Sequence, residues 1–230
     1  MELQLPPGTV LSVVSGSRAY GLDTDGSDVD RRGVFVVPTP MFWRLDKPPT
    51  HVEGPLPEQL SWEVERFCLL ALAANPTVLE CLWSPIVEHS GPVGEELLAM
   101  RRAFLSRRAV ETFGGYSDRQ FRRLDPDDPR WSTAAAGPTR PRKMAMHVIR
   151  LLLSALHLAR HGEPMVPVGA HRDSLLAVRR GEMPWPRVRR WREELAAELA
   201  ERRAGGGALP DEPDRAAVEE LLVSVRRSAL

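Results

Sequence analysis

Two aspartates separated by one residue, Asp28 and Asp30, are the pair in this sequence whose types and spacing most directly suggest chemistry. Residues two apart on a strand point to the same face, so the two carboxylates would project together if one strand carries both. Two such charges repel, and each raises the pKa of the other unless a cation lies between them. Mg²⁺ fits this role, because it takes one or two carboxylates together with substrate phosphates. The spacing therefore predicts a divalent metal site that also holds phosphate.

A Gly-Ser turn precedes the two aspartates. Gly16 and Ser17 follow a short β-branched run at 10–14, and a second run at 34–37 follows the aspartates. Both runs are bounded by turn-forming residues, which indicates strands. We therefore expect a strand-turn-strand unit, in which the backbone N–H groups and the hydroxyl of the turn can bind an anion.

A long segment, 143–161, is apolar at nearly every position, which predicts a buried helix. Its polar residues recur at spacings of three and four and therefore share one helix face. The residues that follow this spacing are Lys143, His147, Arg150, Ser154, His157 and His161. Because an unpaired buried charge is costly, this stripe should face an anion or solvent. A phosphate-binding face and a solvated face both remain open.

The other elements are shorter. A proline-rich stretch at 38–59 predicts a surface loop with a short strand near 41–45, and residues 61–64 are the most strand-like piece after it. Residues 124–142 predict a long loop, and 205–207 predict a linker. Helices are predicted at 65–74, 78–83 with Thr77 as its cap, 93–108, 109–121 unless Gly114-Gly115 divides it, 173–180, 185–203, and 215–227 capped by Asp214.

The composition narrows the functional classes. The 230 residues include 31 basic and 31 acidic side chains, so no overall field attracts nucleic acid or a membrane, and an anionic partner needs a local patch. Cys68 and Cys81 lack metal-ligand spacing, which predicts buried thiols in a reducing compartment. Without an apolar run of about 18 residues or a signal-like N-terminus, we expect no membrane span and a cytoplasmic location.

Three separated blocks of the sequence resemble a known family. The Gly16-Ser17 turn and residues 27–30 resemble the signature of the DNA polymerase β-like nucleotidyltransferase superfamily. Residues 28–35, 75–80 and 143–151 together resemble its RlaP branch, which is associated with bacterial RNA repair operons. The resemblance extends from about Val13 to Trp191.

The resemblance implies an α+β fold, with a small mixed sheet followed by a helical region. It implies a nucleotidyltransferase α/β domain at 1–90, a helical region packing on the active site at 91–204, and a linker and terminal helix at 205–230. The implied reaction transfers a nucleoside monophosphate from a nucleoside triphosphate to an acceptor hydroxyl, with an RNA 3′ end as the suggested acceptor. Other branches modify a protein or a small molecule, and a non-catalytic nucleotide- or RNA-binding module on the same fold is a further alternative.

The resemblance also implies roles for individual residues. Asp28 and Asp30 would hold Mg²⁺ or Mn²⁺ as the catalytic metal pair. The triphosphate would contact Gly16, Ser17 and Arg18. Its charge would be neutralised by Lys143, together with His147 and Arg150.

The superfamily usually supplies a third carboxylate from a later strand. Glu63 is the first choice, because it follows the proline-rich loop in the most strand-like piece. Glu58 and Glu53 are rivals. Without any of them at the site, the chain would bind nucleotide without transferring it.

Two other metal-binding patterns do not fit the sequence. A calcium loop that starts at Asp23 needs Gly at its sixth position and Glu at its twelfth, where this chain has Asp28 and Val34. His157 and His161 have a zinc-like spacing, but no Glu follows the first His and no cysteine is near. An ordinary acidic turn is the remaining alternative at 23–30.

Overall fold

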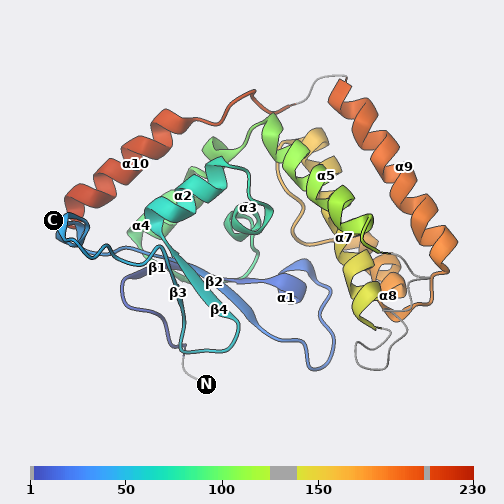
Figure 1. Ribbon diagram of the computed structural model, residues 1–230, viewed down its shortest axis with the longest axis horizontal. Coiled ribbons are helices and arrows are strands. Elements are labelled where there is room, and N and C mark those ends of the chain that lie inside the picture. The colour runs from blue at the N-terminus through green and yellow to red at the C-terminus, as the bar shows by residue number, and fades with distance from the viewer. Residues whose placement is uncertain (1–2, 125–138, 205–207) are drawn as a thin grey trace.

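The structure is a computed structural model that describes residues 3–124, 139–204 and 208–230. A five-stranded mixed sheet forms the N-terminal part, and helices cover one side of it and extend beyond it (Figure 1). The strand order is β3-β4-β2-β1-β5, in which β2 and β4 are parallel and the other neighbours are antiparallel. The strands are β1 (Thr9–Ser15), β2 (Asp30–Phe35), β3 (His51–Glu53), β4 (Gln59–Glu63) and β5 (Val87–Ser90). The predicted α+β fold with a small mixed sheet is confirmed.

The helices follow the predicted segments in most places. Helices α2, α3 and α4 lie over the sheet, and α5, α7, α8 and α9 form a bundle beside it (Figure 1). The α-helices are α1 (Gly16–Tyr20), α2 (Val64–Leu72), α3 (Pro76–Leu82), α4 (Pro92–Ala99), α5 (Arg107–Phe121), α7 (Thr139–His161), α8 (Arg172–Arg180), α9 (Trp185–Ala204) and α10 (Arg215–Ser228). The described residues also form the short 3₁₀ helices η1 (Thr39–Trp43), η2 (Arg101–Phe104) and η3 (Gly169–His171). Among the described residues, no helix is both long and apolar enough to cross a bilayer.

Four local predictions were wrong. The strand predicted near 41–45 is the 3₁₀ helix η1, because Pro40 lies in its first turn and suits a helix start. The single helix predicted at 93–108 is divided into α4, η2 and the start of α5, because the backbone is extended at Leu105 and Ser106. The cap of α3 is Asn75, whose side chain accepts a hydrogen bond from the Val78 N–H at 3.3 Å, and not Thr77. Strand β5 was not predicted.

Of the other predictions on helix ends and loops, the cap of α10 is confirmed and the division of α5 is not. Asp214 caps α10 as predicted, accepting from the Ala217 N–H at 3.0 Å. Helix α5 runs through its glycine pair, and a Cβ on Gly114 would lie 2.8 Å from Leu199 Cδ2 of α9, so this glycine permits close packing of the two helices. Of the loop predicted at 124–142, residues 125–138 lie outside the described residues, as does the predicted linker at 205–207.

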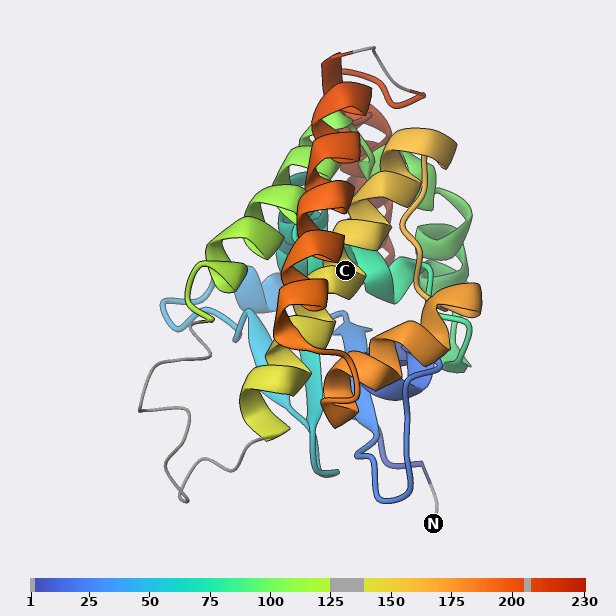
Figure 2. The same ribbon diagram turned by 90° about the vertical axis from the view of Figure 1, so that its right-hand side faces the viewer.

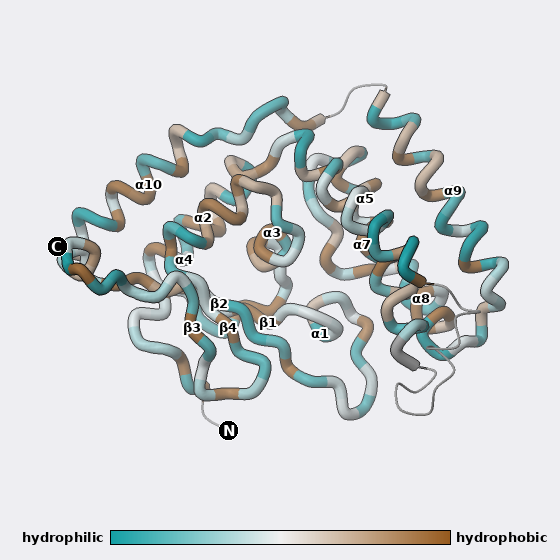
Figure 3. Tube along the Cα trace, in the orientation of Figure 1, coloured by the Kyte–Doolittle hydropathy of each residue, from teal (hydrophilic) through white to brown (hydrophobic). Residues whose placement is uncertain are grey.

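Helix α7 joins two hydrophobic clusters, which confirms that it is a buried helix. Leu151, Leu152 and Leu156 pack with residues of the sheet and of α2 to α5, while Met146 and Ile149 pack with α8 and the start of α9. Figure 2 shows α9 crossing in front of α7 from this side of the molecule. Apolar and polar stretches alternate along α10, as expected for a helix with one packed and one exposed face (Figure 3).

Candidate active site

The carboxylate of Asp30 lies against Gly16, where β1 turns into α1. Asp30 starts β2 and pairs with Ser15, the last residue of β1. A Cβ on Gly16 would lie 2.0 Å from Asp30 Oδ2, and Gly16 has a φ of +66°, in the left-handed region. Glycine is therefore required here both for backbone conformation and for space. The Gly-Ser turn and one of the two predicted metal ligands meet as the sequence analysis expected.

Among the described residues, Asp28 is tied to α1 only through the backbone of its loop. It is exposed and lies in the loop before β2, which begins only at Asp30, so strand alternation does not position its carboxylate. Instead, Arg18 holds the loop, donating from Nη2 to the Ser27 carbonyl at 2.9 Å and from Nε to the Asp28 carbonyl at 3.3 Å. Arg18 was predicted to contact the triphosphate, but in this structure its guanidinium binds the loop backbone. Ser17, the second residue of α1, is half-buried.

The surroundings of Asp30 also include Arg32 of β2 and Glu58 of the turn before β4. Arg32 Nη2 lies 3.8 Å from Asp30 Oδ1, and its Nη1 donates to the Glu58 carbonyl at 2.8 Å. Glu58 directly precedes Gln59, the β4 residue paired with Arg31, so it lies beside the start of β2. The φ of Glu58 is +55°, a conformation that residues other than glycine seldom adopt. Glu58 is thus the rival carboxylate nearest to Asp30 along the sheet.

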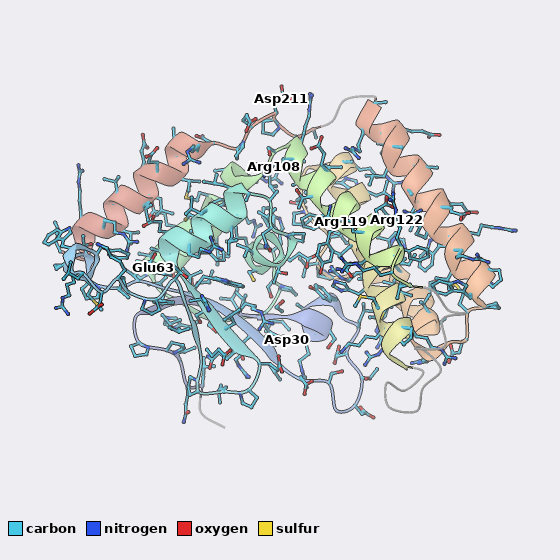
Figure 4. The ribbon with its side chains drawn as sticks, viewed as in Figure 1. Asp30, Glu63, Arg108, Arg119, Arg122 and Asp211 are labelled. Carbon is cyan, nitrogen blue, oxygen red and sulfur yellow. The ribbon has the colours of Figure 1, made fainter. Side chains whose placement is uncertain are left out.

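Glu63 does not join this group, which corrects the first choice for the third carboxylate. It pairs with Phe35, five residues after Asp30, so the two lie about 16 Å apart along the strands. Figure 4 shows Asp30 beside α1 and Glu63 at the opposite end, where β4 meets α2. Glu63 is buried, accepts from Arg226 Nη1 at 2.8 Å and Nη2 at 3.0 Å, and caps α2 through the Glu65 N–H at 2.8 Å. Its oxygens hold α10 and α2, not a metal. Glu53, in β3, pairs with Leu60 and is one strand further from Asp30 than β4.

Arg150 is also committed elsewhere, which corrects its predicted role at the triphosphate. Its side chain is 1% exposed, and Nη1 donates to Glu80 Oε1 at 2.6 Å. The Tyr20 hydroxyl donates to Glu80 Oε2 at 2.7 Å, and the Arg150 guanidinium lies 3.7 Å from the centre of the Tyr20 ring. This triad joins α1, α3 and α7. Two of the blocks that carry the family resemblance, 75–80 and 143–151, are thus joined by the buried Glu80–Arg150 ion pair, and Tyr20, four residues after Gly16, binds the same carboxylate.

The ionisation states of the triad follow from its surroundings. Burial alone would lower the pKa of Arg150, but Glu80 and Tyr20 raise it above its usual value, so the guanidinium stays charged. Burial raises the pKa of Tyr20 by more than the nearby Arg150 lowers it. The hydroxyl therefore remains a neutral donor to Glu80. The triad is therefore a structural unit beneath the Gly-Ser turn.

The remaining residues of the predicted stripe have different environments. Lys143 is exposed, and Ser154 is buried and accepts from the Met165 N–H at 3.1 Å. Burial, with Arg150 and Lys143 nearby, lowers the pKa of His147 to about 3, so this imidazole is neutral at pH 7. His157 and His161 lie against each other with their ring centres 4.4 Å apart. Of the stripe, Lys143 is the exposed cation in the first half of α7.

The donor set around Asp30 suits one kind of metal ion. Within the part of the chain that the structure describes, no group of three or more His, Cys, Asp and Glu side chains could hold a metal by itself. Asp28 and Asp30 offer hard oxygen donors, and Gly16 leaves open the space that a Cβ would fill beside Asp30. Mg²⁺ keeps several waters and needs only one or two carboxylates when phosphates complete its shell. The residues fit a metal bound together with a triphosphate, and not a fully protein-ligated ion.

Sequence reasoning missed the roles of Arg32, Tyr20 and Glu80. All three lie in or beside the blocks that resemble the family, but only Arg32 has a local signal, as a cation two residues after Asp30. The pairing of Glu80 with Arg150 joins residues 70 apart, and helix periodicity carries no sign of it.

Sequence similarity gives these features a family context. The model of the family described as "RNA repair pathway DNA polymerase beta family", RlaP, matches residues 2–224. The chain is also 31% identical over 96 residues to the uncharacterized protein YcgL of Bacillus subtilis (strain 168), an alignment that covers 40% of this chain and 37% of that protein. This chain thus spans little more than a third of that relative's length. No solved structure matches the chain significantly.

Proposed function

We propose that this chain, which belongs to the RNA repair pathway DNA polymerase beta family (RlaP), is a metal-dependent nucleotidyltransferase. Membership of a polymerase β-like family indicates a nucleotidyltransferase-type role. The observation that supports a catalytic site here is the approach of the Asp30 carboxylate to the glycine turn, with Asp28 exposed on the adjoining loop. A carboxylate beside a turn that opens a helix is suited to a metal-bound triphosphate.

The proposed reaction moves a nucleoside monophosphate from a nucleoside triphosphate to an acceptor. An acceptor hydroxyl oxygen bonds to the α-phosphorus while the bond from that phosphorus to the β-bridging oxygen breaks. Pyrophosphate leaves, and the hydroxyl proton passes to solvent. An RNA 3′ end is the acceptor we propose, since the family is described by an RNA repair pathway.

Each residue has a proposed task in this reaction. Asp28 and Asp30 would hold Mg²⁺ or Mn²⁺, which when bound neutralises phosphate charge and polarises the reacting oxygens. Gly16 and Ser17 would orient the triphosphate through the N–H groups and hydroxyl of the turn. Lys143 would add positive charge, while His147, being neutral, would act only as a hydrogen-bonding group.

The test measures transfer of label from an α-labelled triphosphate. The full chain is incubated with each of the four ribonucleoside triphosphates, Mg²⁺ or Mn²⁺, and RNA, protein or no acceptor. We expect label on RNA with the parent protein, none with Asp28→Asn or Asp30→Asn, and full transfer with Asp25→Asn. Asp25 is a matched control, because it is an exposed aspartate of the same loop. Transfer that survives both Asp28→Asn and Asp30→Asn would refute the proposal, and label on protein would replace RNA as acceptor.

One observation favours a second candidate, a non-catalytic nucleotide-binding module. In the described residues, no third metal-binding carboxylate joins Asp28 and Asp30. Such a module would bind triphosphate in the presence of Mg²⁺ but transfer label to no acceptor. The same experiment, run beside equilibrium dialysis with the triphosphate, separates the two candidates.

A further inference from the structure

A cavity of about 670 Å³ opens between α8 and the first turns of α9. Met183 and Trp191 line it and are partly buried against the second hydrophobic cluster. Arg187 and Arg190 are exposed at its edge, and Glu194 is the carboxylate in its lining. The cavity therefore combines an aromatic, apolar wall with two cations and one hydrogen-bond acceptor.

The segment that forms this cavity is strongly basic. Residues 171–192 contain seven arginines and two carboxylates, in a chain whose overall charge is zero. Within the described part of the chain, four of the seven bind carboxylates or carbonyls: Arg172, Arg179, Arg180 and Arg192. The other three, Arg187, Arg189 and Arg190, have no ion-pair or hydrogen-bond partner among the described residues. The segment is the local patch that an anionic partner of a neutral chain requires.

Helix α8 lies between this cavity and the end of α1, the helix that begins at the Gly-Ser turn. Arg172 Nε donates to the Gly21 carbonyl at 2.9 Å, and Arg179 Nη1 donates to the Leu22 carbonyl at 3.0 Å, at the end of α1. Residues seven apart share a helix face, whereas Ser174, which lines the cavity, lies two residues from Arg172 and faces away. The cavity and the end of α1 are thus on opposite sides of one helix, about 10–12 Å across.

We infer that this cavity holds one nucleotide of a single-stranded nucleic acid that serves as the acceptor. The base packs against Trp191 and Met183, since stacking on an aromatic ring is the common way to hold an unpaired base. Arg187 and Arg190 bind the adjoining phosphates, and Glu194 accepts a hydrogen bond from the base. The assignment as an acceptor site rests on the proposed nucleotidyl transfer, whereas the binding itself does not depend on it.

The test is a binding measurement without catalysis. The fluorescence anisotropy of a 5′-labelled single-stranded RNA 12-mer is titrated with the full chain in EDTA, without triphosphate, at several salt concentrations. We expect Arg187→Gln/Arg190→Gln to weaken binding roughly tenfold and to reduce the slope of log K against log salt by about 1.4, the value for two phosphates on a single strand. The matched control is Arg66→Gln/Arg108→Gln, which removes the same charge at two exposed arginines outside both the basic segment 171–192 and the cavity lining.

Each outcome decides the question. Undetectable RNA binding by the parent protein, binding unchanged in the cavity variant, or equal weakening by the control overturns the site. If AMP binds as tightly as the 12-mer and depends equally on Arg187 and Arg190, the cavity is a mononucleotide site and the acceptor assignment is wrong. A failure of the proposed function is recognised separately, as label transfer that does not depend on Asp28 or Asp30.

Discussion

Replacing Arg150 by methionine should make this protein unfold far more readily, and it should not remove a direct contact with nucleotide. The side chain of Arg150 is 1% exposed and that of Glu80 is 4% exposed, and their closest atoms are 2.6 Å apart. Arg150→Met keeps an unbranched apolar chain in place of the arginine stem but leaves the Glu80 carboxylate buried without its cation. Removing one partner of a buried ion pair typically costs about 3–5 kcal/mol.

That loss is large on the scale of protein stability. Folded domains are stable by about 5–15 kcal/mol, so Arg150→Met should remove about a fifth or more of the total. For a chain of this size, about 2–4 °C of melting temperature is lost per kcal/mol, which predicts a decrease of about 6–20 °C. The double variant Glu80→Leu/Arg150→Met should lose less, about 1–3 kcal/mol, because the orphaned Tyr20 hydroxyl is the main unpaired group.

The assay is urea unfolding followed by circular dichroism, with the single and double variants measured side by side. A destabilisation of Arg150→Met below about 1 kcal/mol would refute the buried-pair reasoning. So would a double variant as unstable as the sum of its two single variants, because residues in contact should not be additive. If Arg150 instead served the triphosphate, Arg150→Met would lose nucleotide binding while its unfolding free energy stayed unchanged.

Three further predictions concern the turn, the end of β4 and the buried histidine. Gly16→Ala should abolish label transfer, because the added Cβ would displace the carboxylate of Asp30. The control Gly21→Ala, with a φ of +69° and nothing within 4 Å of its Cβ, should retain transfer and lose only about 1 kcal/mol of stability. Label transfer by Gly16→Ala would contradict the proposed site. Glu63→Gln and Arg226→Met should each destabilise the protein by about 2–4 kcal/mol, while the label transfer per folded molecule stays unchanged. If Glu63→Gln is inactive and Arg226→Met is active, the Glu63 carboxylate has a catalytic role. The pKa of His147 is about 3 in the folded protein and ordinarily 6.5, so between these pH values the unfolded chain binds more protons and the stability of the fold decreases as the pH falls. From pH 6.5 to pH 5 the parent protein should lose about 1–2 kcal/mol more stability than His147→Gln does. Parallel curves of stability against pH for the two proteins would show that the imidazole is not buried.

The parts predicted correctly from the sequence depend on local patterns. The approach of Gly16 to Asp30 is set by one short strand pair, β1 and β2, whose residues are close in the chain. The burial of α7 follows from its largely apolar sequence, so it can be predicted without knowing which elements pack against the helix. In both cases, the residues that decide the structure lie within about 25 positions of each other.

The wrong predictions concern partners that are distant in sequence. Arg150 has the spacing of a solvent- or anion-facing stripe, but Glu80, 70 residues earlier, neutralises it inside the core. Glu63 lies in the predicted strand, but its parallel register with β2 puts it at the end opposite Asp30, where Arg226, 163 residues later, pairs with it. A periodic pattern specifies a face of a helix or strand, but not which element from elsewhere in the chain covers that face.

The most direct test of nucleotidyl transfer at Asp30 compares two positions of the label in one triphosphate. With the parent protein and with Asp25→Asn, α-label should appear on the RNA acceptor and γ-label in pyrophosphate. With Asp30→Asn, neither product should form, although the variant keeps its unfolding transition. Transfer of γ-label to the acceptor, or undiminished transfer by Asp30→Asn, would contradict the account.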